Sequence, residues 1–491
     1  ENIDANFTQN SNTVLPGYIP RTDNFGLDFG YQDTFANRRS PLLPPTTGFI
    51  LGSQKDIRGI AAENGWITRD TTLSNLFLNN KTTQFTARTA IEPFRGFRIE
   101  LSMSRSETRN NSSFFRWVTD SSLPEGGSYQ EIDPLSTGNF NMSYIFVNSA
   151  FESLTERVTR DSITFDAIAT SNAFEEFSRN RQIISARRAG LTPNLNALSR
   201  QGEVEGGYQN GYLGNNQDVL LPAFLSAYGI IGPEKITLKN FPKIPLPNLS
   251  INNNGLTNLP FLKDIFNSIT LKHTYRASYS VGSFNNNINA DVENGFPVNT
   301  TVFREDVNGL PLENFQTEDN IASVSIREDF SPLIGVNMTM KNGITASIDY
   351  KRGRMLNLSV GTMQLSELHN QDLAVMFGYR KDKLDWQFTF MGKDFDLQNS
   401  MNAQLRLTMR DTREFNRSIV FDPANPDEAL DAQYTRGTLN WIISPSIDYV
   451  VNTRLNLKLF YEQNINRPYT SQSFDTSFAS GGVQIRFTLS N

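Results

Sequence analysis

The sequence contains no cysteine and only two histidines among its 491 residues. Without cysteine the chain has no disulfide bond, no thiolate nucleophile and no thiolate metal ligand. The two histidines, His273 and His369, lie far apart in the sequence, so a histidine metal site or a Ser–His pair for a lipase-type barrel has little support. We therefore expect no catalytic residue, no metal and no cofactor, and a protein that is not an enzyme.

Long apolar segments are also missing. No run approaches the ~20 residues that a membrane-spanning helix requires. Hydrophobic residues make up 38% of the chain, below the roughly 45–50% of globular domains, whereas aromatic residues reach 11%. This combination is typical of strands with one face in lipid and the other in water, and without helices only a closed β-barrel crosses a membrane.

An excess of positive charge is absent as well. The 45 Lys and Arg residues are outnumbered by 51 Asp and Glu residues, which gives a net charge of −6. A nucleic-acid-binding protein presents a basic face to the phosphates, so we expect no nucleic-acid partner. The chain starts at Glu1 without an apolar leader, and we expect it to be a mature product or a piece of a longer protein.

Period-two alternation is the strongest positive signal in the sequence, and it predicts long β-strands. Turns at Pro93–Gly96 and at Lys341–Gly343, which contains Asn342-Gly343, predict two hairpins. Ile344–Gly361 reads as one strand, whose Arg352 and Arg354 would stand at or above the lipid headgroups. The residues predicted to line a polar lumen are Arg98, Glu100, Ser102, Thr345, Ser347 and Asp349.

The C-terminal third continues the same alternation. Its predicted short turns, at Lys341–Gly343, Lys381–Lys383, Arg410–Thr412 and Asn452-Thr453, would lie on the periplasmic side. The last strand is predicted to carry Val483, Ile485, Phe487 and Leu489. The residues expected to face lipid or to form an aromatic belt at the membrane interface are Phe97, Ile99, Leu101, Trp386, Trp441, Tyr449 and Tyr461.

The middle of the chain has a different pattern. Asp161–Ala189 has apolar residues at helical spacing, Pro222–Ile231 is a second compact apolar element, and Gly202–Asn216 reads as a loop. The predicted fold is all-β: a large antiparallel transmembrane β-barrel segment with a mixed helical and loop insertion that caps or plugs one mouth. The predicted division is 1–150 for the first barrel strands, 151–267 for the insertion and 268–491 for the C-terminal strands.

Several stretches resemble, in order, the C-terminal part of the SprA family, the giant outer-membrane barrels of the Bacteroidetes type IX secretion system. They include GLTNLPFLKDIFNSITLKHTYRASYSVGSF at Gly255–Phe284, EDFSPLIGVNMT at Glu328–Thr339 and NSMNAQLRLTMRD at Asn399–Asp411. The resemblance implies a cell-surface translocon in the outer membrane that exports folded cargo proteins and is linked to gliding motility. It also implies four partners beside outer-membrane lipid: the remainder of the barrel, a PorV-like barrel of the lipid-transporter family, a periplasmic plug protein and the cargo.

A free-standing porin or solute-transporter barrel is the alternative that the strand pattern leaves open. It needs about the same strands, but it predicts that this chain closes on itself. The sequence alone therefore defines the strands and their two faces, and it leaves open whether they form a whole barrel or part of one.

Overall fold

The computed structural model describes most of the chain. The described residues are 2–33, 35, 38–53, 55–152, 155–160, 165–306, 308–384, 386–390, 392–419, 432–452, 454–470 and 474–488. Leu489, which was predicted in the last strand, lies outside them.

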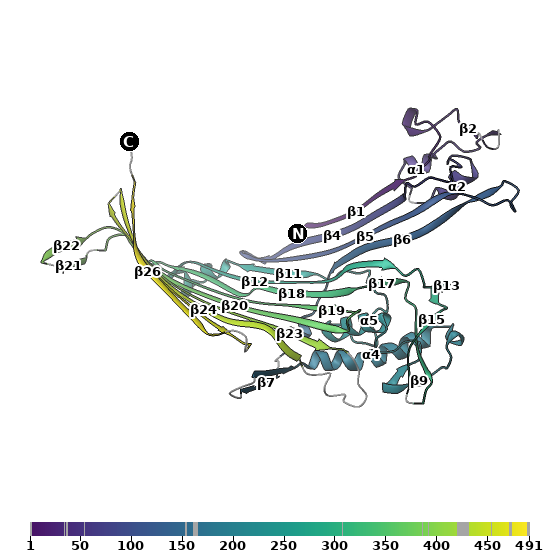
Figure 1. The fold of residues 1–491 in the computed structure, drawn as a ribbon. Helices are drawn as coiled ribbons and strands as arrows, with labels where there is room; N and C mark the ends of the chain where they lie inside the picture. Colours follow the sequence, from purple (N-terminus) through teal and green to yellow (C-terminus); the bar gives the residue numbers. More distant parts are fainter. Residues whose placement is uncertain are drawn as a thin grey trace.

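One large antiparallel sheet dominates the fold (Figure 1). Its N-terminal half contains β1 (Asn2–Val14), β4 (Phe77–Phe94), β5 (Phe97–Thr119), β6 (Gly127–Ser143), β7 (Thr155–Arg160), β8 (Phe165–Thr170), β11 (Asn248–Asn253) and β12 (Phe266–Asn286). Its C-terminal half contains β17 (Asp319–Ile321), β18 (Ser323–Met340), β19 (Ile344–Ser359), β20 (Gln364–Lys381), β23 (Met401–Ser418), β24 (Ala432–Asn452), β25 (Leu455–Pro468) and β26 (Thr476–Phe487). The prediction of a mostly β chain with a large antiparallel sheet is confirmed.

Small elements decorate this sheet. Five two-stranded ribbons are β2–β3 (Gln32–Asp33, Arg38–Arg39), β9–β10 (Glu203–Val204, Tyr208–Gln209), β13–β14 (Val292–Glu293, Phe296–Pro297), β15–β16 (Thr300–Glu305, Pro311–Phe315) and β21–β22 (Trp386–Phe390, Lys393–Leu397). The helices are α1 (Thr47–Ile50), α2 (Arg58–Glu63), α3 (Val147–Ala150), α4 (Asn172–Leu191), α5 (Gln217–Tyr228) and α6 (Pro260–Lys263). Among the described residues, no helix combines the length and apolar character needed to cross a membrane.

We call the end of the sheet at which β4 turns into β5 and β18 turns into β19 the turn end, and we call the opposite end the rim. β4 and β5 pair across the predicted turn, where Gly96 has a φ of 82°, and β18 and β19 pair across Lys341–Gly343, where Gly343 has a φ of 86°. Glycine adopts positive φ without a steric penalty. Both predicted hairpins, and the single strand that begins at Ile344, are confirmed.

Two sequence predictions about local structure are wrong. Arg410–Thr412 is not a turn, because β23 pairs continuously with β20 from Met401 to Ser418. The helix predicted over Asp161–Ala189 begins only at Asn172, since Phe165–Thr170 forms strand β8 and Ser171 caps the helix through its hydroxyl, which accepts from the Phe174 N–H. In a single sequence, charged residues within a strand resemble a turn, and the apolar residues of a short strand resemble part of a helix.

One strand position in the sheet is filled by two separate segments. Between β5 and β12, β6 occupies the rim half and β11 the turn-end half. The chain leaves this strand position after Ser143 and returns to it at Asn248, and the Leu246 N–H donates to the Ser143 carbonyl at 3.0 Å. Between these points β7 and β8 extend the sheet elsewhere, since β8 pairs with the start of β24. Residues 144–247 therefore form an insertion, here called the insertion, that starts and ends at the same place. The range predicted from the sequence was 151–267.

The main apolar core lies between this insertion and one face of the sheet. α4 and α5 pack together and cover the rim half of β12, β18, β19 and β20. Every residue of α5 from Val219 to Tyr228 is buried. This core is what holds the insertion on the sheet, because burial of apolar side chains is the main favourable term in packing.

The two ends of the sheet's strand order are unpaired on their outer sides within the described residues. β1 pairs with β4 alone and β26 pairs with β25 alone. Figure 1 places these two strands at opposite margins of the sheet. The sheet that the described residues form is therefore open.

Candidate functional site: the two faces of the sheet

The register of the strands places the predicted lumenal residues on one face of the sheet, here called the polar face. Arg98 lies opposite Asn252, which lies opposite Lys272; Lys272 lies opposite Gly335, and Gly335 lies opposite Asp349. Residues directly opposite one another point to the same side of a sheet. Because side chains alternate along a strand, Glu100 and Ser102 share the face of Arg98, and Thr345 and Ser347 share that of Asp349.

The polar face carries charge near the turn end. Arg98 and Glu100 form an ion pair at 2.7 Å, and both side chains are exposed. An exposed pair of this kind contributes little to stability. The exposed ion pair indicates that this part of the face is a water-exposed surface rather than a binding site.

Toward the rim the polar face includes rows of uncharged side chains. One such row crosses five neighbouring strands, from β12 to β23, and consists of Ser280, Ser325, Asn357, Ser366 and Asn416. Sequence reasoning missed it, although the Ser and Asn residues that alternate with Ile326, Leu356 and Leu365 were its signal. Hydroxyl and amide groups form hydrogen bonds with water and carry no net charge.

The opposite face, here called the apolar face, is hydrophobic near the turn end. A row of Val336, Ile348, Val375, Leu407 and Ile443 crosses β18 to β24. The predicted lipid-facing residues of the main sheet lie on this same face by register: Phe97, Ile99, Leu101, Trp441, Tyr449, Tyr461, Val483, Ile485 and Phe487. Trp386 is separate, since it begins the β21–β22 ribbon outside the main sheet.

Exposure on the apolar face is unusual for a protein surface in water. Val483, Ile485 and Phe487 are each about 60% exposed, and Leu459, Phe377 and Ile447 are exposed too. Large contiguous apolar surfaces mark interfaces with lipid or with other proteins. Which medium covers this face stays a prediction.

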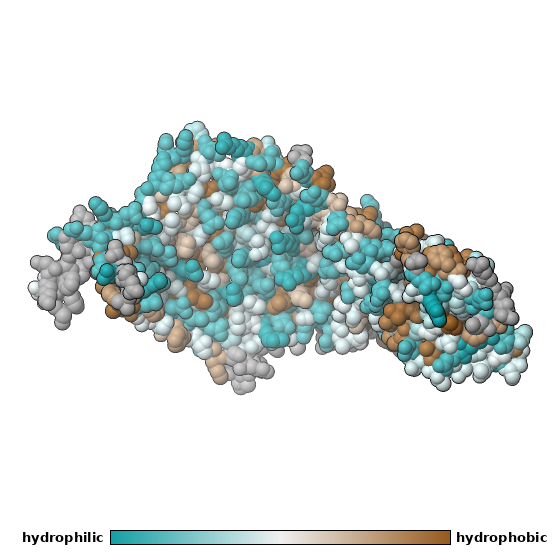
Figure 2. Space-filling view, turned by 90° about the horizontal axis from the view of Figure 1, so that it is seen from above, coloured by the Kyte–Doolittle hydropathy of each residue, from teal (hydrophilic) through white to brown (hydrophobic). Residues whose placement is uncertain are grey.

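A second group of exposed apolar residues lies at the N-terminal end of the molecule. It includes Phe25, Phe29, Leu42 and Leu51. In Figure 2 hydrophobic residues gather at the end where Figure 1 places α1 and β2, whereas hydrophilic residues predominate over the middle of the same view.

Toward the rim the apolar face is covered by the insertion, and charged groups are buried there. Arg354 on β19 and Glu328 on β18 form an ion pair at 2.7 Å, with side chains 6% and 1% exposed. Arg354 also donates to the carbonyl oxygens of Phe146 and Ser149 at 3.0 and 2.8 Å, and Tyr275 donates to Glu328 at 2.7 Å. Burial of an ion pair is costly unless further hydrogen bonds satisfy both partners, and here they do. Arg354 therefore lies under the insertion, a burial that the sequence did not predict, and its predicted level relative to the lipid headgroups stays a prediction.

A second buried ion pair lies two strands further along. Glu367 on β20 accepts from Arg417 at 2.9 Å and lies 3.2 Å from Nε2 of His369. The Tyr228 hydroxyl of α5 approaches the same carboxylate at 3.4 Å. Together, Arg354, Glu328, Glu367, Arg417 and the groups that they contact on the insertion form what we call the junction.

The helices of the insertion carry their own buried polar groups at this junction. Arg181 of α4 donates to the carbonyl oxygens of Gly214 and Ile419, both at 3.3 Å, and burial lowers the pKa of its guanidinium. Glu152 accepts from the Ala173 N–H at the start of α4, and burial raises the pKa of its carboxyl group. The Asn180 amide donates to Ser226 at 2.9 Å and joins α4 to α5.

The junction has the chemistry of a structural anchor. Its acids are held by arginines, and His369 and His273 lie apart, with Nδ1 of His273 2.7 Å from the Leu333 carbonyl. In the part of the chain that the structure describes, no group of three or more acidic or histidine side chains is placed to hold a metal ion. No protein-family model and no curated protein sequence matches the chain.

Proposed function

We propose that this chain forms part of the wall of a protein-conducting channel in the bacterial outer membrane, the type IX secretion translocon, which exports folded cargo and is linked to gliding motility. The observation that carries the proposal is the division of the sheet into a polar face and an apolar face over many long strands. A wall between lipid and a wide aqueous lumen has this division. The ordered resemblance to the SprA family supports the type of channel.

The length of the strands supports a wall that extends beyond the membrane. β20 contains 18 residues, which at ~3.3 Å per residue span about 60 Å, whereas the hydrocarbon layer is about 30 Å thick. In the proposed arrangement the turn-end half, with its exposed apolar residues, lies in lipid. The rim half then stands outside it.

The position of the insertion follows from this arrangement. It packs on the apolar face, so with the polar face toward the lumen the insertion lies outside the wall, where it supports the part that projects from the membrane. We therefore propose a buttress in place of the cap or plug expected from the sequence, and any gating falls to other partners.

The uncharged rows suggest how a lumen would pass diverse cargo. Folded proteins carry surface charges of both signs, and a charged wall would attract one sign and slow passage. Ser, Thr and Asn side chains keep water at the wall. No local chemistry is needed, because the wall only has to remain wet and non-adhesive.

The two unpaired edges favour the translocon over the free-standing porin. A porin made by this chain would require β1 to pair with β26, whereas each of these strands has one neighbour in the part of the sheet that the structure describes. In the proposed complex, further strands of the barrel would pair with these edges. The PorV-like barrel, the plug protein and the cargo rest on the resemblance alone.

Charge placed in the uncharged row tests the channel. In cells that depend on the variant chain, we expect Ser325→Arg combined with Asn357→Arg to reduce export of a folded fluorescent cargo about tenfold, because the arginines bind acidic cargo surfaces. The matched control is Ser347→Arg at the turn end, on the same face as the Arg98–Glu100 pair and two residues from Asp349, which should change export less. Variant levels in the outer membrane are measured in parallel.

The result that contradicts the proposal is clear. If cells that lack the chain export the cargo normally, or if the purified chain closes alone and conducts small solutes, the porin alternative replaces it. Intact mass and peptide mapping of the purified complex add an independent check, because the translocon predicts further barrel strands beside residues 1–491.

A further inference from the structure

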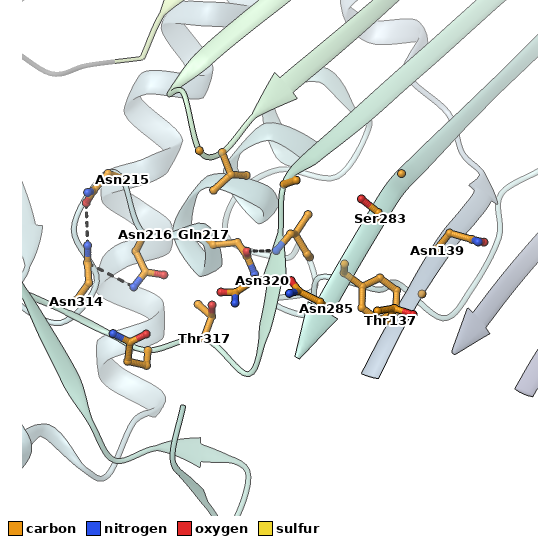
Figure 3. A pocket seen from close by; sticks show the side chains of 18 of the residues that line it. Thr137, Asn139, Asn215, Asn216, Gln217, Ser283, Asn285, Asn314, Thr317 and Asn320 are labelled. Carbon is orange, nitrogen blue, oxygen red and sulfur yellow. Dashed lines mark hydrogen bonds between the residues drawn. The ribbon is translucent and has the colours of Figure 1, made fainter. Parts of the chain in front are cut away.

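A polar cavity of about 790 Å³ lies at the rim, outside the junction (Figure 3). It is formed where the interior of β6 and the ends of β12 and β17 meet the start of α5 and the turn between β19 and β20. Ligand sites commonly occupy roughly 300–1,000 Å³. The cavity therefore has room for a small molecule or a few sugar units.

The lining of this cavity contains no charged side chain. Asparagine, glutamine, serine and threonine provide most of its polar groups, and the two aromatic residues of the lining, Phe284 and Phe315, are buried. Entry of an ion into such a site would remove water without supplying a counter-charge. The lining therefore selects a ligand that is polar but neutral.

One side of the cavity is rigid. Gln217 donates to the Asp319 carbonyl at 2.9 Å and accepts from the Ile321 N–H at 2.7 Å, while Asn314 donates to Asn215 at 2.9 Å. Figure 3 shows these side chains converging at the start of α5. Because they are already paired, they shape the site and are not its main ligand-binding groups.

The other side presents unpaired groups. Asn110, Thr137, Asn285 and Asn320 lie directly opposite one another across β5, β6, β12 and β17. Among the described residues, none of these four side chains has a hydrogen-bond partner, and the three amides are exposed. Each amide offers both a donor and an acceptor, so the row can hydrogen-bond to neighbouring hydroxyl groups.

The floor between the two sides is open because it contains glycines. A Cβ atom built on Gly282 or on Gly361 would meet nothing within 4 Å, and neither has a positive φ. Side chains at these positions would therefore project into free space.

We propose that this cavity binds a neutral oligosaccharide. Sugar hydroxyls match the paired donors and acceptors of a row of amides, and an uncharged glycan enters without an uncompensated charge. A peptide would instead be recognised mainly by backbone pairing with a free strand edge. Here β12 at Asn285 is paired with β6 on one side and β17 on the other, and the Gln217 side chain bonds to the backbone on the outer side of β17.

The test measures binding to the full chain in detergent. Saturation-transfer NMR and calorimetry use maltohexaose and chitotetraose as neutral probes and an oligoguluronate as the charged comparison. We expect at least one neutral probe to bind and the charged one not to bind. Gly282→Phe should weaken neutral binding at least about tenfold, because the ring fills the floor, and Asn285→Ala with Asn320→Ala should do the same.

The matched control is Gly190→Phe, at the exposed end of α4, where an added Cβ also meets nothing within 4 Å. It should leave binding unchanged. Binding that survives Gly282→Phe, absence of binding by both neutral probes, equal binding of the oligoguluronate, or displacement of the sugar by a Ser- and Gly-rich peptide would each overturn the proposal. Neutral glycans released from lipopolysaccharide and from secreted glycoproteins, compared in the same assay, distinguish the two sources. None of these results depends on cargo export.

Discussion

Arg354 and Glu328 stand opposite each other on β19 and β18, and the insertion removes both from water. The alternation of the sequence assigns Arg354 to a face, and that assignment holds. The alternation contains no information about what covers that face, because the covering residues of the insertion lie some two hundred positions before Arg354 in the sequence. The sequence therefore predicted which residues share a face of the sheet but not the burial of these charges.

Breaking this pair should loosen the insertion. We expect Arg354→Met or Glu328→Gln alone to cost about 3–5 kcal/mol of docking stability, because each leaves the partner charge buried and unpaired. Hydrogen exchange over α3 to α5 measures the loss.

The control for that experiment is Arg327→Met, one residue away on the polar face, where the ion pair with Asp329 is exposed. Its effect should stay within about 0.5 kcal/mol. The double variant Glu328→Leu with Arg354→Met should recover part of the loss, because no isolated charge remains. A single variant that exchanges like the wild-type chain would show that the pair does not anchor the insertion.

Among the elements, hairpins whose turn has a strong sequence signal were predictable, whereas strand pairings without such a signal were not. Asn342-Gly343 fixes both the turn and the register of β18 and β19. Arg410–Thr412 resembles a turn, yet Asp411 pairs with Arg413 within the strand at 2.7 Å. The composite strand of β6 and β11 has no local signal, because the insertion separates its two parts in the sequence.

The start of α4 is set by a cap. Ser171 is buried, and its hydroxyl accepts from the Phe174 N–H at 3.3 Å. We expect Ser171→Ala to destabilise the first turn of α4 by about 1 kcal/mol, seen as faster hydrogen exchange at residues 172–176. Ser199→Ala, at an exposed serine whose hydroxyl bonds to nothing among the described residues, should leave the exchange unchanged. Equal exchange in both variants would contradict the capping role.

Across the whole molecule, the open sheet is the feature that separates the candidate functions. The chain has no native cysteine, so any disulfide within a double-cysteine variant joins the two introduced residues. In the proposed translocon, Phe7→Cys combined with a cysteine at Ala479, Val483 or Phe487 should give no intramolecular disulfide in the outer membrane. A link within one chain at any of these sites would favour the self-closed porin.

Two pairs of neighbours serve as positive controls. Phe7 lies directly opposite Phe85, and Val483 lies directly opposite Leu459. Facing residues on antiparallel strands are close enough for a disulfide or a short cross-linker. Both control pairs should form links, and a failure of either would show that the strands are not arranged as described.

The way in which the insertion joins the sheet bears on how the chain can evolve. Met142 faces Arg105 and Asn248 faces Ser102, so Ser143 and Tyr144 fill the two places between them. A polypeptide that ran directly from Tyr144 to Asn248 would continue one strand without a change of register, direction or face. The sheet and the insertion can therefore be gained, lost or exchanged as separate genetic modules, and a shorter relative with a plain strand at this position would need new residues over the whole covered face, from Tyr279 on β12 to Leu365 on β20.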